Sequence, residues 1–203
     1  RADGLGSTIV AESLVLDPSA NVTVTDGARI ELAGSLQNAM TNADAFAMDT
    51  GILGVGGNEP AWFEVAGRDL GTHVSSGNFG MMQLVVGSPI EAVTVYLTDI
   101  RDNDGLGQDD REALYLFGSG GLDGLEMYGG SQLVLGNVPV YALLDGALVE
   151  LHSLFTSGKR VVPFNMGNND GYLVLPRFVP GDANGDDRVD DADAKTLAAN
   201  WGQ

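Results

Sequence analysis

The chain has 203 residues, of which 28 are acidic and 10 are basic, so its formal net charge is −18. A charge of this size repels phosphate backbones and anionic membranes, which excludes nucleic acid as an expected partner. Cysteine is absent, which excludes disulfides, thiolate metal sites and cysteine nucleophiles. The sequence also has no run of about 18 apolar residues, the length needed to span a bilayer.

Short stretches of alternating apolar and polar residues recur along the chain and predict β-strands. The first three, residues 14–16, 22–24 and 30–32, follow one another at intervals of eight residues. The Asp26-Gly27 pair favours a hairpin locally. Further strands are predicted at residues 62–65, 83–86, 93–97, 114–116, 132–135 and 138–141. Because 44% of the residues are hydrophobic, this pattern predicts a folded, all-β body.

Two architectures explain this spacing. Short strands are either successive sides of a coil in a parallel solenoid or antiparallel neighbours in a sandwich. The 29 glycines suit the corners of the first and the hairpins of the second equally well, so the periodicity leaves both open. Residues 143–174 are expected to close the far end of the body, where an irregular cap would block edge-to-edge growth.

The composition changes at residues 179–181, from apolar strand residues to a segment rich in aspartate. We therefore expect a β-rich body over residues 1–178 and a tail over residues 179–203. Residues 182–193 place oxygen-bearing side chains at positions 1, 3, 5, 9 and 12 of an EF-hand-type loop, with the backbone carbonyl of position 7 as a further ligand. The expected calcium ligands are Asp182, Asn184, Asp186, Arg188, Asp190 and Asp193.

This loop departs from the pattern at two positions. Asp187 stands at position 6, where glycine is usual, and Asp193 replaces the longer glutamate at position 12. A solvated acidic turn without metal is the alternative; we favour calcium because carboxylates this close repel one another without a cation. After the loop, Leu197 and Trp201 are four residues apart and predict a short helix over residues 192–201.

A second acidic cluster lies between two predicted strands. Its members are Asp99, Asp102, Asp104, Asp109, Asp110 and Glu112. Residues 102–105 are similar to half of a calcium loop, but the later carboxylates do not fall at EF-hand positions. A second calcium ion and a merely solvated loop are both compatible with this sequence.

Catalytic signatures are missing from the sequence. The two histidines, His73 and His152, are expected to be structural, and no nucleophile elbow, dinucleotide fingerprint or Walker pattern occurs. A polysaccharide lyase or glycosidase is the strongest enzymatic alternative. A lyase would need basic groups near its substrate, however, and the basic residues are scattered, with Lys159-Arg160 as their only neighbouring pair. We therefore expect no enzyme.

The chain also carries a family resemblance. Residues 92–99, 102–105 and 112–116, followed by 130–135 and 137–141, resemble the bodies of secreted planctomycete-type surface proteins, which are repetitive, glycine-rich and adhesin-like. This resemblance implies a β-solenoid body, similar to a parallel β-helix, with a jelly-roll β-sandwich as the alternative. The tail resembles one repeat of the type I dockerins, which carry aspartate at position 12 and whose complete domain has two repeats.

These observations predict a secreted, calcium-binding structural or adhesive protein of the cell surface, a subunit of an extracellular filament or surface layer. The chain begins at Arg1 without an apolar export segment, which suits a mature product. Residues 8–10 are expected to add to the sheet edge of a second copy. A carbohydrate-binding or scaffold-anchored module is the second hypothesis, with Trp62, Tyr115, Tyr128 and Tyr141 as candidate sugar-stacking residues.

Overall fold

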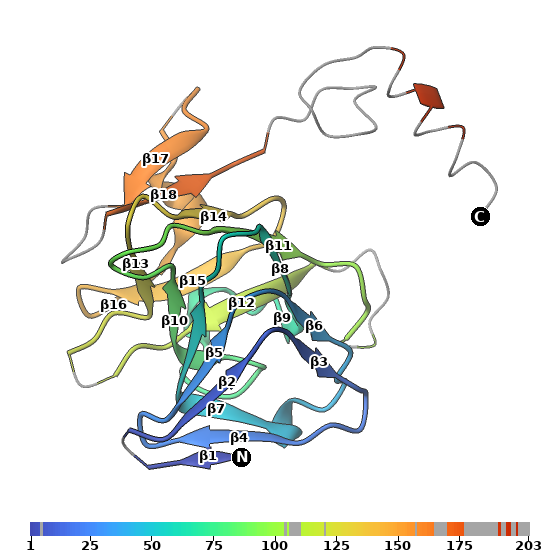
Figure 1. Ribbon diagram of the computed structural model, residues 1–203, viewed down its shortest axis with the longest axis vertical. Coiled ribbons are helices and arrows are strands. Elements are labelled where there is room, and N and C mark those ends of the chain that lie inside the picture. Colours follow the sequence, from blue (N-terminus) through green and yellow to red (C-terminus); the bar gives the residue numbers. More distant parts are fainter. Residues whose placement is uncertain are drawn as a thin grey trace.

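The computed structural model describes residues 1–4, 6–103, 105, 111–119, 121–156, 158–164, 170–176, 191, 194–195 and 198. Nearly half of the described residues are in strands, most of them short (Figure 1). The strands are β1 (Ala2–Asp3), β2 (Thr8–Ala11), β3 (Leu14–Leu16), β4 (Val22–Thr25), β5 (Arg29–Leu32), β6 (Leu36–Asn38), β7 (Phe46–Val55), β8 (Ala61–Glu64), β9 (Gly67–Arg68), β10 (Met81–Val86), β11 (Thr94–Thr98), β12 (Glu112–Leu116), β13 (Leu125–Met127), β14 (Gln132–Val134), β15 (Val140–Leu144), β16 (Ala147–Glu150), β17 (Val161–Phe164) and β18 (Gly171–Val174). Three 3₁₀ turns complete the body: η1 (Ala43–Ala45), η2 (Gly71–His73) and η3 (Leu151–Leu154).

The predicted all-β body is confirmed as a mostly β structure, and strands lie at or within a few residues of every position that the alternation predicts. Several strands were not predicted. The longest of them, β7, has ten residues and carries a run of five buried residues at its end instead of an alternation. Among the described residues, no helix is long and apolar enough to cross a membrane. The described tail residues 191, 194–195 and 198 are helical.

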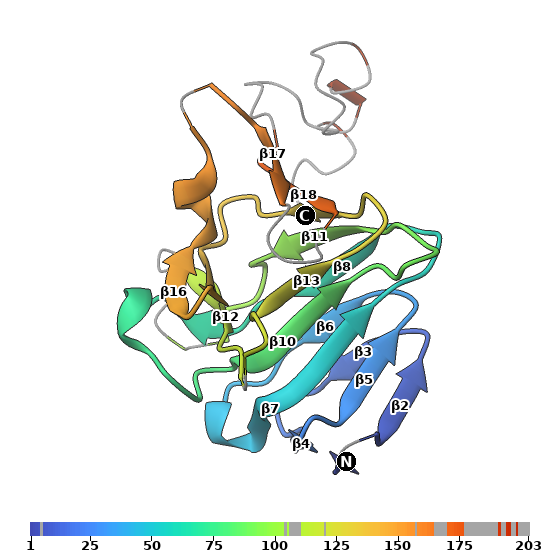
Figure 2. The ribbon, with the colours of Figure 1, turned by 90° about the vertical axis from the view of Figure 1, so that its left-hand side faces the viewer.

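Strands far apart in the sequence pair in parallel. β1, β2 and β3 pair with β4, β5 and β6, in the same order. The next strand, β7, pairs with β4 through its first half and with β5 through its second half, while β6 pairs with β8. Figure 2 shows β2, β5, β7 and β10 side by side and running in the same direction. These strands therefore pair with partners later in the chain and not with their neighbours in sequence.

The register of this pairing keeps apolar side chains in continuous rows. The row formed by β2, β5, β7, β10 and β13 aligns Ile9, Ile30, Leu53, Leu84 and Leu125. From Ile30 onward these side chains are buried. Burying aliphatic side chains in such rows is the main source of stability for strands this short, because each strand alone has few backbone hydrogen bonds.

Two further rows contribute to the same apolar core. In the first, Met48, Met81, Leu116 and Ala142 align through β7, β10, β12 and β15. The second runs through the seven-stranded sheet and aligns Ala61, Val95, Leu133 and Leu173. All of these residues belong to one buried cluster that extends from Ala2 to Leu173.

In the described part of the chain, three pairs of strands are antiparallel, apart from two isolated antiparallel bridges, Ser88–Glu91 and Ser119–Leu122. β9 pairs with β12, β15 with β16, and β17 with β18. Together the strands form an eleven-stranded and a seven-stranded sheet, both mixed. A jelly-roll sandwich pairs its strands antiparallel, whereas most neighbours here are parallel. Two of the antiparallel pairs and η3 lie within residues 143–174 or at their border, the segment expected to close the far end.

The hairpin prediction at Asp26-Gly27 is wrong. Both residues adopt positive φ angles, 55° and 74°, as a tight turn requires, but the strands on either side, β4 and β5, do not pair with each other. They pair instead with β1, β2 and β7. The turn is a corner between two sheet positions, because the longer-range parallel partners bury more apolar surface than a local two-stranded hairpin would.

Candidate functional site

The expected calcium loop lies outside the described residues, apart from Asp191. This holds for all six expected ligands, Asp182, Asn184, Asp186, Arg188, Asp190 and Asp193. Within the part of the chain that the structure describes, no group of three or more histidine, cysteine, aspartate or glutamate side chains is arranged to hold a metal.

The described members of the second acidic cluster organise the backbone around them. Asp99 Oδ2 accepts a hydrogen bond from the backbone N–H of Glu112 at 3.1 Å, and Asp102 Oδ1 accepts one from Gly105 at 2.7 Å. The buried Glu112 carboxylate accepts from the backbone N–H of Asn103. The Asn103 amide in turn donates to the carbonyl of Met40 at 2.7 Å. These contacts tie the loop to the corner after β6. The other members, Asp104, Asp109 and Asp110, lie outside the described residues.

Only one of the four candidate sugar-stacking residues is well exposed. Trp62 is 52% exposed. Tyr115 and Tyr141 are buried, and Tyr128 is half-buried, with its hydroxyl donating to Glu126. That contact is the main cause of a raised pKa at Tyr128. The prediction of a sugar platform is therefore wrong for Tyr115 and Tyr141, which are core residues.

Trp62 has an aromatic neighbour that the sequence did not indicate. Tyr96 occupies the paired position on β11, and the two rings stack with centroids 5.9 Å apart and an interplanar angle of 18°. Trp62 lines a hollow of about 250 Å³ together with Gln37 and Arg101. The wall also contains Glu64, whose buried carboxylate accepts hydrogen bonds of 2.7 Å from two successive backbone N–H groups after β11.

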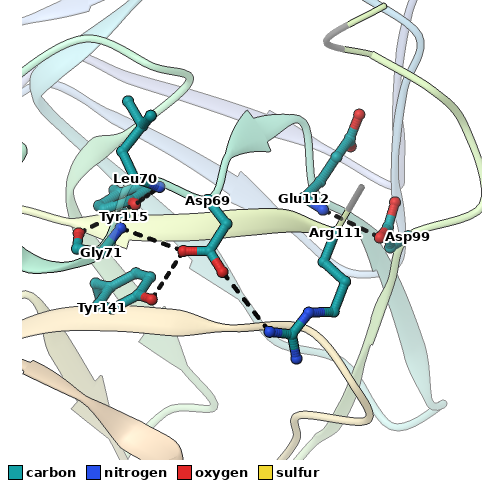
Figure 3. A network of polar contacts seen from close by, with 8 residues as sticks. All are labelled: Asp69, Leu70, Gly71, Asp99, Arg111, Glu112, Tyr115 and Tyr141. Carbon is teal, nitrogen blue, oxygen red and sulfur yellow. Dashed lines mark hydrogen bonds and ion pairs between the residues drawn. The ribbon is translucent and has the colours of Figure 1, made fainter. Parts of the chain in front are cut away.

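Asp69 is the centre of a second polar network (Figure 3). Its Oδ1 atom accepts a hydrogen bond of 2.8 Å from the Tyr141 hydroxyl and one of 3.2 Å from the backbone N–H of Gly71. Its Oδ2 atom lies 3.9 Å from Arg111 Nη2. Tyr115 donates to the Gly71 carbonyl at 3.1 Å. Burial is the main cause of a raised pKa at both tyrosines, and the charge of Asp69 adds to it.

Arg111 also lines a hollow with a cavity volume of about 570 Å³. The cavity is built from segments that are distant in the sequence. Its polar lining includes Arg111, Asn137, Glu150, His152 and Arg160. Arg111 directly precedes β12, Glu150 ends β16, His152 lies in η3 and Arg160 directly precedes β17.

The expected scatter of basic residues does not hold at this cavity. The pairing of β17 with β18 and the η3 turn bring Arg160 and His152 to the same hollow as Arg111. His152 is held at the wall, because its Nε2 lies 3.3 Å from the carbonyl of Gly136 and its ring packs on Phe155. No local pattern predicts this gathering, since Arg111 and Arg160 are 49 residues apart.

Comparison with protein families, curated proteins and solved structures finds no match for the chain.

Proposed function

We propose that this chain is a secreted, calcium-binding structural or adhesive protein of the cell surface, with no catalytic role, whose body is a β-solenoid. The observation that carries the proposal is the parallel register that persists from Ile9 to Leu125 through five strands. A β-solenoid of stacked coils is a stiff rod with uniform faces, a form suited to a structural role.

The strand set at the start of the body supports self-association. Within the described residues, β1, β2 and β3 each pair along one edge only. Exposed apolar side chains accompany these edges: Val10 is 78% exposed and Val15 is 64% exposed. Unpaired strand edges with apolar side chains are templates for strands of another chain. We infer that copies of this chain associate through these strands into filaments or a surface layer.

Sedimentation velocity and negative-stain microscopy of the full chain test this association. We expect assemblies that grow with protein concentration, and we expect Val10→Lys combined with Val15→Lys to leave monomers, because lysines at a strand edge oppose pairing. Ile90→Lys is the matched control, since Ile90 is 90% exposed in a turn away from β2 and β3. Monomers of the unmodified chain at high concentration, with and without calcium, would refute the proposal.

Calcium is proposed to bind the tail on the strength of its ligand spacing. Hard cations prefer carboxylate and carbonyl oxygens, and an acidic chain of net charge −18 gains from a bound divalent ion by reduced self-repulsion. The resemblance of the tail to a dockerin repeat further suggests that it anchors the body to a scaffold.

Carbohydrate binding is the second candidate function, favoured by the exposed Trp62–Tyr96 stack beside a hollow. Exposed aromatic ring faces offer apolar surface on which the apolar face of a sugar ring can stack, and nearby polar groups can bind its hydroxyls. Affinity electrophoresis in gels containing plant or bacterial polysaccharides tests it. Retardation that Trp62→Ala abolishes and Tyr172→Ala preserves would support this function, because Tyr172 has similar exposure to Tyr96 but lies on another strand. Equal retardation of both variants would refute it.

A further inference from the structure

The 570 Å³ cavity concentrates positive charge on a strongly acidic protein. Two arginines line it, although the whole chain has only 10 basic residues against 28 acidic ones. Elsewhere on such a chain the field repels anions. A pair of guanidinium groups at one hollow therefore marks a place where an anionic group is bound in preference to the rest of the surface.

The guanidinium groups are available to a ligand. Arg160 is exposed and has no ion pair within the described part of the chain. Arg111 contacts Asp69, but only at 3.9 Å, and its side chain is 66% exposed. Asp69 is already hydrogen-bonded to Tyr141 and Gly71. Figure 3 shows one edge of the Arg111 guanidinium facing Asp69, so this contact orients Arg111 while other N–H donors stay free.

The other residues that line the cavity restrict which kind of anionic ligand fits it. Glu150 places one carboxylate in the same cavity, which disfavours more than one anionic group inside the cavity itself and offers an acceptor for hydroxyl groups. The Asn137 amide adds both a donor and an acceptor, and Pro139, Leu175 and Pro176 provide apolar surface. The volume falls in the range of about 300–1,000 Å³ that is typical of small-molecule sites.

We propose that this cavity binds an acidic sugar, with Arg111 and Arg160 holding the carboxylate of a uronic acid residue and Glu150 and Asn137 holding its hydroxyl groups. A uronate combines one negative charge, several hydroxyls and an apolar ring face, which matches two cations, one acid, an amide and an apolar wall. His152 is a positioning residue, because the hydrogen bond to Gly136 fixes η3 at the rim. The site does not depend on the proposed assembly, since Val10 and Val15 do not line it.

Isothermal titration of the full chain with trigalacturonate at constant ionic strength tests the site. We expect saturable binding of trigalacturonate and no comparable binding of trigalactose. Arg160→Gln and Arg111→Gln should each lower the affinity for trigalacturonate about tenfold or more, because each removes a charge-assisted hydrogen-bonding group. Lys159→Gln is the matched control: it removes the same charge from an exposed neighbour that does not line the cavity. It should bind as the unmodified chain does.

Three outcomes would overturn the proposal. The first is no binding of trigalacturonate. The second is equal binding of sulfate and trigalacturonate, which would mean general anion attraction without sugar recognition. The third is equal weakening in Lys159→Gln and Arg160→Gln, which would assign the effect to net charge. Thermal unfolding of each variant should match that of the unmodified chain, because Arg111 and Arg160 are exposed, so lost binding will not reflect lost folding.

Discussion

Tyr115 and Tyr141 occupy directly paired positions on the parallel strands β12 and β15, and their rings stack with centroids 4.9 Å apart and an interplanar angle of 15°. Both hydroxyls reach the same short loop: Tyr141 donates to Asp69, and Tyr115 donates to Gly71 and accepts from the backbone N–H of Leu70 at 2.8 Å. The stack therefore joins two neighbouring strands to the segment between β9 and η2.

Removing one ring of this stack should be costly. Tyr115→Ala is expected to lower the free energy of unfolding by about 3–5 kcal/mol, because it leaves a cavity and removes the stacking contact. Tyr172→Ala, at a 39% exposed position, should lower it by less than about 1 kcal/mol. Urea unfolding followed by circular dichroism measures both. Similar losses in the two variants would contradict the structural role of the stack.

Alkaline pH should destabilise the protein through the same tyrosines. The pKa of Tyr141 is raised above its ordinary value of 10.0, first by burial and then by the hydrogen bond to Asp69. A raised folded-state pKa means that the folded protein holds the proton more tightly than the unfolded chain does. The stabilisation is therefore complete below about pH 10 and is lost as pH rises above it.

The Tyr141→Phe variant isolates this effect. Its free energy of unfolding should fall less steeply than that of the unmodified chain when urea unfolding is repeated from about pH 8 to about pH 11. The variant lacks the titrating hydroxyl but keeps the ring. Parallel pH profiles for the two proteins would show that Tyr141 does not titrate with a raised pKa.

Close backbone packing between strand sets predicts a sharp contrast between two glycines. A Cβ atom at Gly51 would clash with the carbonyl oxygen of Val24, whereas one at Gly56 would meet no atom within 4 Å. Gly51→Ala should therefore cost about 1–3 kcal/mol through overpacking against backbone that cannot move aside. Gly56→Ala should be neutral or stabilising by up to about 1 kcal/mol. Thermal unfolding distinguishes the two, and equal midpoints would contradict the packing of β7 on β4.

Calcium should bind the tail with measurable affinity. Calorimetric titration of chelator-treated protein with calcium is expected to give one saturable site. Asp182→Asn combined with Asp190→Asn should lower the calcium affinity about tenfold or more, because each change removes an anionic ligand. Asp17→Asn is the control, as Asp17 is exposed in a turn far from the tail in sequence. Unchanged heat in the double variant would reject the loop as the calcium site.

The local β-structure of this protein follows from its sequence. Residues 22–25 and 29–32 alternate buried and half-buried side chains, so their strand character and inward faces are predictable from a period of two. The positive φ angles at Asp26 and Gly27 are equally local, because they depend on the residues of the turn itself. The strand β7 escaped prediction because burial on both faces removes the alternation.

The choice of partners depended on the tertiary structure. The turn at Asp26-Gly27 suits a hairpin as well as a corner, and only the distant strands β1, β2 and β7 decide between them. Arg111 and Arg160, which are 49 residues apart in the sequence, likewise line one hollow only in the folded chain. A sequence determines which backbone shapes and faces are favourable at each position, since those are short-range energies. The sequence does not by itself indicate which strand faces pack together, because the choice of partners depends on the apolar area that the whole chain buries at once.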